Sequence, residues 1–167
     1  MNATRVCTRT ADQRKALFQL PPAPTAPRSA RRLVENVLAD WGTPVGLAES
    51  LRLLASELVT NAVAHGDGQV GLALFVTPAT DDSPCAVLRM EVADVSPEPA
   101  RQGGLGGDDE HGRGLLLVDA LADQWGQDLF AEGKRVWCEF ALAGGPDECD
   151  ALGPERDRES ATRKSRS

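Results

Sequence analysis

The chain has 167 residues, close to the usual size of one domain, and carries 18 Lys and Arg against 25 Asp and Glu, a formal net charge of −7. This charge, with no basic patch in the central part of the chain, argues against nucleic acid as a direct partner, because a negative surface repels phosphate. An aromatic share of 4%, with no Tyr, also argues against platforms on which bases stack.

The first part of the chain predicts one strand and two helices. Residues 1–14 are polar without a clear period and are expected to be disordered. Residues 16–20 predict a short strand that ends at Pro21 and Pro22. Apolar residues at helical spacing predict helices over 28–41 and 45–65, and a glycine follows each of them.

The second part predicts two pairs of strands around a third helix. Strands are predicted over 70–77 and 86–94, because apolar residues alternate along both. Residues 96–111 are rich in Pro and Gly and have no period, so we expect a mobile loop. A helix is predicted over 114–125, followed by strands at 129–131 and 135–142 that a turn at 132–134 joins.

Three helices and about five strands, mostly consecutive as hairpins, predict an α+β fold. We expect a two-layer sandwich with three helices on one face of a mixed, mostly antiparallel sheet. Residues 15–143 would form this one domain, and residues 144–167, almost without apolar side chains, are expected to be a disordered tail.

Two further patterns bear on location. The chain has no apolar run near the roughly 18 residues that a membrane span needs, and its first ten residues lack the apolar stretch of a signal peptide. We therefore expect a cytoplasmic protein with no membrane partner. The cysteines, at positions 7, 85, 138 and 149, include no C-x-x-C pair, so reduced thiols are favoured over a disulfide or a metal site.

Polar side chains follow one edge of the second predicted helix. Glu57, Asn61 and His65 are spaced i, i+4 and i+8. A carboxylate and an amide one turn apart suit a proton acceptor and a ligand for a hard cation such as Mg²⁺. By itself, the same spacing is also typical of a solvated helix edge.

Asp94 is expected on the buried face of its strand, because alternation places it with Leu88, Met90 and Val92. An ionised carboxylate is costly there unless it is paired. Two interpretations stay open at this point. The carboxylate either caps a neighbouring turn or accepts a hydrogen bond from a ligand donor such as an exocyclic amine.

The segment Gly112-Arg113-Gly114 opens the third predicted helix directly after the loop. The free backbone N–H groups of a helix start suit an anion, phosphate above all. A G-x-G before a helix is also common at hinges and tight turns. The P-loop pattern and the dinucleotide pattern G-x-G-x-x-G are both absent, so a nucleotide would bind by another route.

Three segments in a fixed order carry a resemblance to a known family. They read E-L-V-T-N-A-V-A-H, E-V-A-D-V-S-P and H-G-R-G-L-L-L-V. The chain resembles the GHKL ATPase superfamily and, within it, the anti-sigma-factor serine/threonine kinases and their single-domain, histidine-kinase-like relatives in actinobacteria. The resemblance covers residues 16–142, including the late strand G-K-R-V-W-C-E-F, and it implies the GHKL fold with ATP and Mg²⁺ as cofactors.

The resemblance also implies roles for single residues. Glu57 would be the catalytic general base, Asn61 would ligate the Mg²⁺ that bridges the ATP phosphates, and Asp94 would accept from the adenine amino group. The phosphates would meet the helix start, which consists of Gly112, Arg113, Gly114 and Leu115. The loop before this helix start would be the ATP lid.

Some positions depart from the superfamily pattern. The pattern D-x-G-x-G appears here as Asp94-Val95-Ser96-Pro97, without the first glycine, whereas closer relatives commonly show D-x-S-P. Lys134 belongs to a segment that the family uses near phosphate, and His65 ends the second helix. For both side chains the simpler interpretation is that they are solvated.

The function that the resemblance implies is an ATP-binding serine/threonine kinase in transcription regulation. It would act as an anti-sigma factor, phosphorylate an anti-sigma-factor antagonist and form a homodimer. The alternative is a non-catalytic, ATP-dependent protein-binding module in a partner-switching circuit. Glu57 favours the kinase, because a pure binding module needs no base. A sensor histidine kinase is disfavoured, since neither His65 nor His111 lies in a helical hairpin that bears a phosphoacceptor.

Overall fold

The computed structural model describes residues 4–10, 13–66, 68–80, 85–96 and 113–142. These residues form six strands and three helices. In chain order the elements are β1 (Thr4–Thr10), β2 (Gln13–Leu20), α1 (Ala26–Trp41), α2 (Val45–His65), β3 (Val70–Thr77), β4 (Ala86–Asp94), α3 (Arg113–Leu121), β5 (Gln124–Phe130) and β6 (Gly133–Leu142).

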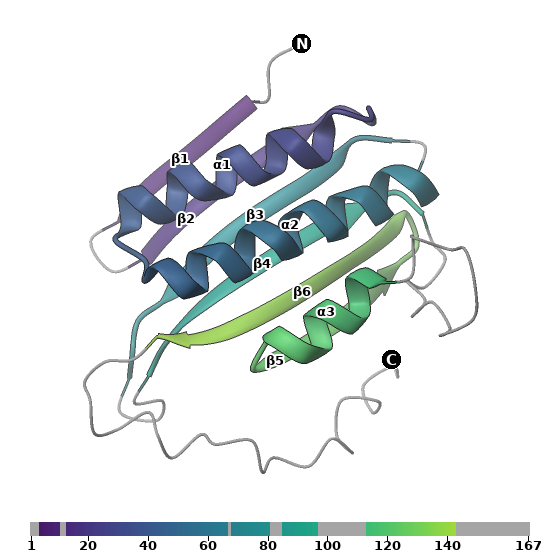
Figure 1. The fold of residues 1–167 in the computed structure, drawn as a ribbon. Coiled ribbons are helices and arrows are strands. Elements are labelled where there is room, and N and C mark those ends of the chain that lie inside the picture. The colour runs from purple at the N-terminus through teal and green to yellow at the C-terminus, as the bar shows by residue number, and fades with distance from the viewer. Residues whose placement is uncertain (1–3, 11–12, 67, 81–84, 97–112, 143–167) are drawn as a thin grey trace.

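The strands form one sheet in the order β1-β2-β3-β4-β6-β5, and all three helices lie on one face of it (Figure 1). This arrangement confirms the predicted two-layer α+β sandwich. Every strand pair in the described residues is antiparallel, so the sheet lacks the parallel part expected of a mixed one. Strands β4 and β6 are neighbours, although α3 and β5 lie between them in the chain.

Glycine and proline set the ends of the two long helices. Helix α1 has a proline in its first turn, where the missing N–H costs nothing. It ends at Gly42, whose left-handed backbone (φ 69°) lets its own N–H donate to the carbonyl of Ala39 and the N–H of Thr43 donate to that of Leu38. Helix α2 starts directly after Pro44 and ends before Gly66, at the bounds that its apolar period predicts.

The hydrophobic core lies between the helices and the sheet. Leu74 of β3 and Met90 of β4 face each other across the two strands, and both are fully buried. The helices contribute Val34 of α1 and Leu54 and Leu58 of α2 to the same core. Full burial of one such side chain contributes about 1.5–3 kcal/mol to folding, so this layer is the main source of stability.

The opposite face of the sheet carries charged side chains in a ladder. Arg89 donates to Glu91 (2.7 Å) and Glu139 (2.6 Å), and its guanidinium lies 4.1 Å from the ring centre of Trp137. Burial alone would lower the pKa of Arg89, but the two carboxylates outweigh it and raise this pKa. No helix of the described chain covers this face, which is why charges alternate with the core residues along β4.

Two regions differ from the sequence prediction. Strand β1 lies in a segment expected to be disordered and pairs with β2 from Thr4↔Gln19 to Thr10↔Gln13. Helix α3 ends at Leu121 rather than at 125, and β5 is correspondingly longer. The reason is Trp125, which pairs with Cys138 in β6, packs against the core and donates its indole N–H to Asp119 (3.0 Å).

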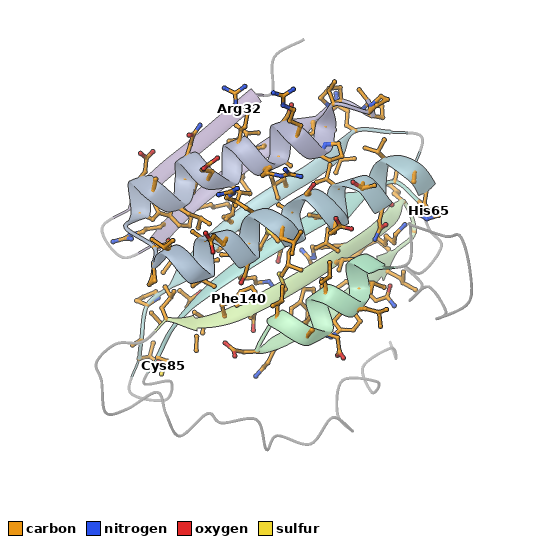
Figure 2. All side chains as sticks on the ribbon, in the orientation of Figure 1. Arg32, His65, Cys85 and Phe140 are labelled. Carbon is orange, nitrogen blue, oxygen red and sulfur yellow. The ribbon has the colours of Figure 1, made fainter. Side chains whose placement is uncertain are left out.

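The cysteines also differ in part from expectation. Cys138 is a free, buried thiol, as predicted. Cys85 is buried and disulfide-bonded, so the prediction of reduced thiols is wrong at this position, because spacing along a sequence does not say which sulfurs the fold brings together. Cys85 and His65 lie at opposite ends of the molecule (Figure 2).

In the described part of the chain, none of the helices has the length and hydropathy to cross a membrane.

The predicted mobile loop, residues 96–111, lies outside the described residues except for Ser96, and the predicted tail, residues 144–167, lies entirely outside them.

The side chain of Cys138 is fully buried, and this burial raises the pKa of its thiol to about 12. At about pH 8.5, near the pKa of an exposed thiol, we expect iodoacetamide to leave Cys138 unmodified in the native protein and to alkylate it after denaturation. Mass spectrometry of the peptide that contains Cys138 measures both yields, and equal alkylation rates in the two states would contradict the prediction.

Candidate functional site

The residues singled out in the sequence gather at one end of the sheet. The C-terminal half of α2, the start of α3, the end of β4 and the start of β6 all lie there (Figure 1). His65, the last residue of α2, marks this end in the side-chain view and is exposed (Figure 2). The fold therefore brings together segments that are far apart in the chain.

Helix α3 begins directly against the polar edge of α2. A Cβ atom on Gly114 would lie 2.6 Å from Nδ2 of Asn61 and 3.4 Å from Cβ of Glu57. Glu57 and Asn61 are both half-buried, and Gly114 is buried. Only a residue without a side chain lets the two helices approach this closely, so Gly114 places the first turn of α3 beside both polar groups.

Asp94 lies at the end of β4 in a buried ion pair with Lys134 of β6. Its Oδ1 atom is 3.0 Å from Nζ of Lys134, and the side chains are 5% and 6% exposed. The same oxygen accepts the backbone N–H of Ser96 at 2.8 Å. The carboxylate thus caps the turn after β4, as one of the two sequence interpretations proposed, and the lysine compensates its charge.

Two glycines fix the position of Asp94. A Cβ on Gly66, just after α2, would lie 3.4 Å from Cβ of Asp94, and one on Gly133 would lie 2.0 Å from the Asp94 carbonyl oxygen. Gly133 also has a φ of 156°, which L side chains rarely adopt. Asp94 is therefore held between the end of α2 and the start of β6. Helix α2 also carries Glu57 and Asn61.

The donor set near α2 suits a cation that takes few protein ligands. Among the described residues, no group of three His, Cys, Asp or Glu side chains lies close enough to hold a metal. Mg²⁺ commonly takes one or two protein oxygens and completes its shell with phosphates and water. The side-chain amide oxygen of Asn61, half-buried beside a helix start, fits that need and not a closed protein cage.

The remaining predicted positions divide into three kinds. Leu115 is 2% exposed, with its side chain in the core, so only its backbone N–H is available to a ligand. Gly112 lies outside the described residues, and Arg113 begins α3. Lys134, expected as a solvated turn residue near phosphate, instead lies buried on Asp94, because it belongs to the start of β6 and not to a turn over 132–134.

Comparisons with known proteins agree with one another. The model of the histidine kinase-like ATPase domain matches residues 20–139. An uncharacterized protein of Streptomyces coelicolor is 34% identical over 85 residues, which are 50% of this chain and 81% of that protein. A solved structure of RsbU and RsbW domains from Mycobacterium tuberculosis aligns with a TM-score of 0.53 at 20% identity, covering 77% of this chain.

The family match confirms the superfamily inferred from the sequence motifs. At 20% identity, the solved structure shows a shared fold and nothing finer, and this chain spans only 33% of its length.

The close packing at Gly133 predicts a marked difference between two glycine substitutions. We expect Gly133→Ala to lower the free energy of unfolding by about 2–4 kcal/mol, because the new methyl group meets backbone atoms that have no room to move and φ is positive. Gly46→Ala, in the first turn of α2 with open space around it, should raise it by about 0.4–1 kcal/mol. Urea unfolding measures both, and equal effects of the two changes would contradict the packing described here.

Proposed function

Since the chain belongs to the histidine kinase-like ATPase domain family, we propose that it binds ATP with Mg²⁺ and phosphorylates a serine or threonine of a protein partner. One observation supports this most directly. Glu57 and Asn61 lie against Gly114 at the start of α3, at the same end of the sheet as the buried carboxylate of Asp94. A base, a metal ligand, a phosphate site and a purine site would thus be adjacent.

The adenine would lie at Asp94. Both described hydrogen bonds to this carboxylate end on Oδ1, so Oδ2 is the oxygen that would accept the exocyclic amine. A hydrogen bond to a charged acceptor contributes about 1.5–3 kcal/mol, more than a bond between neutral groups. Asp94 would therefore supply much of the specificity for the base.

The phosphates would lie at the start of α3. The first N–H groups of a helix have no partner within it and attract anions. Gly114 brings these groups within reach of the polar edge of α2, because nothing projects between the two helices. Asn61 would hold Mg²⁺ through its amide oxygen, and the bound ion would neutralise charge on the phosphates during transfer.

Glu57 would act on the acceptor hydroxyl. It would take the hydroxyl proton as the hydroxyl oxygen bonds to the γ-phosphorus. The bond from that phosphorus to the oxygen it shares with the β-phosphate would break, and ADP would leave with the electron pair. The base and the Mg²⁺ ligand are one helical turn apart, which keeps them adjacent without a loop to position either of them. Phosphoryl transfer depends mostly on such positioning and on charge neutralisation.

The partners follow from the family resemblance. The substrate would be an anti-sigma-factor antagonist, and a sigma factor would bind the same chain, which would act as a homodimer in the cytoplasm. The formal charge of −7 supports protein partners over nucleic acid.

A second candidate is a module that binds ATP without transferring phosphate. In this case ATP would only alter affinity for a protein partner. Glu57 favours the kinase, since it contributes nothing to a site that only binds.

Two substitutions on α2 separate these candidates. We expect Glu57→Gln to retain ATP binding and to slow transfer at least roughly 10²-fold, because it removes the proton acceptor alone. Asn61→Ala should lose the Mg²⁺-dependent part of ATP affinity, because it removes a metal ligand. Calorimetry with and without Mg²⁺ measures binding, and transfer of labelled phosphate to serine or threonine of a co-purified protein measures activity.

Glu49→Gln is the matched control, since Glu49 is an exposed carboxylate near the start of the same helix. It should leave binding and transfer unchanged. If Glu57→Gln transfers phosphate as fast as the unmodified chain, or if no co-purified protein is ever labelled, the binding module replaces the kinase. If the unmodified chain binds no ATP at millimolar concentrations with Mg²⁺, both candidates fail.

A further inference from the structure

Lys134 is a buried lysine at the start of β6. It is 5% exposed and is the register partner of Asp94 across β4 and β6. Lysine is almost never this buried unless it is paired, because its ammonium loses hydration. Asp94 supplies the pairing, at 3.0 Å from Nζ to Oδ1. The turn cap from Ser96 already gives this carboxylate one hydrogen bond without any lysine.

The hydrogen-bonding groups of the pair are only partly used. An ammonium has three N–H donors, and within the described residues the contact recorded for Lys134 is the one to Asp94. The contacts recorded for the Asp94 carboxylate both end on Oδ1. The pair therefore presents an acceptor oxygen and an N–H donor side by side at the place where adenine is proposed to bind.

We propose that Lys134 is a base-specificity residue, which donates a hydrogen bond to N1 of adenine while Asp94 accepts one from the N6 amine. This assignment rests on the proposed function, since it needs ATP at Asp94. Adenine carries a donor at N6 next to an acceptor at N1, which matches the acceptor and donor of the pair. Guanine carries the reverse, an acceptor at O6 next to a donor at N1, and so meets two mismatches.

The surroundings of Asp94 favour such an arrangement. Gly66 and Gly133 flank it, and a Cβ atom on Gly66 would lie in van der Waals contact with Cβ of Asp94, at 3.4 Å. The ion pair also fixes both polar groups before any ligand arrives, so a base would pay little to order them.

A purely structural role for Lys134 predicts a different result from base recognition. If the lysine only balances the charge of Asp94, its removal destabilises the fold and weakens all purine nucleotides alike. If it contacts N1, its removal weakens ATP but not an analogue that lacks N1. The readout is thus the difference in affinity between the two nucleotides, because a general loss of stability leaves that difference unchanged.

The experiment compares ATP, 1-deaza-ATP and 7-deaza-ATP by calorimetry with Mg²⁺, on the full chain and on Lys134→Met. For the unmodified chain we expect 1-deaza-ATP to bind about 10- to 100-fold more weakly than ATP, the range for loss of a charged hydrogen bond, and 7-deaza-ATP to bind like ATP. In Lys134→Met, ATP and 1-deaza-ATP should bind equally. Lys15→Met, on β2, is the matched control and should retain the full difference.

A second variant covers the case in which Lys134→Met does not fold. The double change Asp94→Asn with Lys134→Met removes both buried charges, and it should bind ATP and 1-deaza-ATP equally weakly. Equal binding of ATP and 1-deaza-ATP by the unmodified chain overturns the role of Lys134 while leaving the proposed function intact. Absence of ATP binding by the unmodified chain overturns the proposed function and this assignment together.

Discussion

The strict alternation of side chains along β4 is the constraint on which the rest of the structure depends. This strand lies between β3 and β6, and its helix-facing side carries Leu88, Met90 and Val92 into the core. Because successive side chains point to opposite faces, the same alternation places Asp94 beneath the helices. A shift of register by one residue would expose the apolar side chains and the carboxylate would leave the site. Core and site are therefore determined by one and the same register.

The buried carboxylate then explains several neighbours that look unrelated in the sequence. Its charge is balanced by Lys134 at the start of β6, its backbone carbonyl leaves no room for a side chain at Gly133, and its turn is capped through the backbone N–H of Ser96. The missing first glycine of the superfamily pattern, whose position Ser96 occupies, is therefore of little consequence for this turn. Ser96 takes part through its backbone N–H, which any residue except proline provides.

The sequence was sufficient to predict the bounds of an element wherever one face of that element is apolar. The bounds of α2, β3 and β4 agree with their predicted ranges, because burial selects the period that the sequence displays. Strand β1 has no such period, and its pairing with β2 depends on backbone hydrogen bonds that composition does not encode. The predicted boundary between α3 and β5 was wrong, because Trp125 fits the apolar pattern of the helix but packs against the core from β5. The Asp94–Lys134 contact needed the strand register, which no local pattern contains.

That register has an evolutionary consequence. Asp94 and Lys134 are paired across β4 and β6, so the segment that leaves β4 after Asp94 enters β6 opposite the same residue, after passing through β5 at the edge of the sheet. The excursion between them, which includes α3 and β5, begins and ends at one fixed point. Insertions and deletions within it would leave the first four strands and both long helices in place. A lineage could thus change whatever this segment contacts while keeping the Asp94–Lys134 pair and the polar edge of α2.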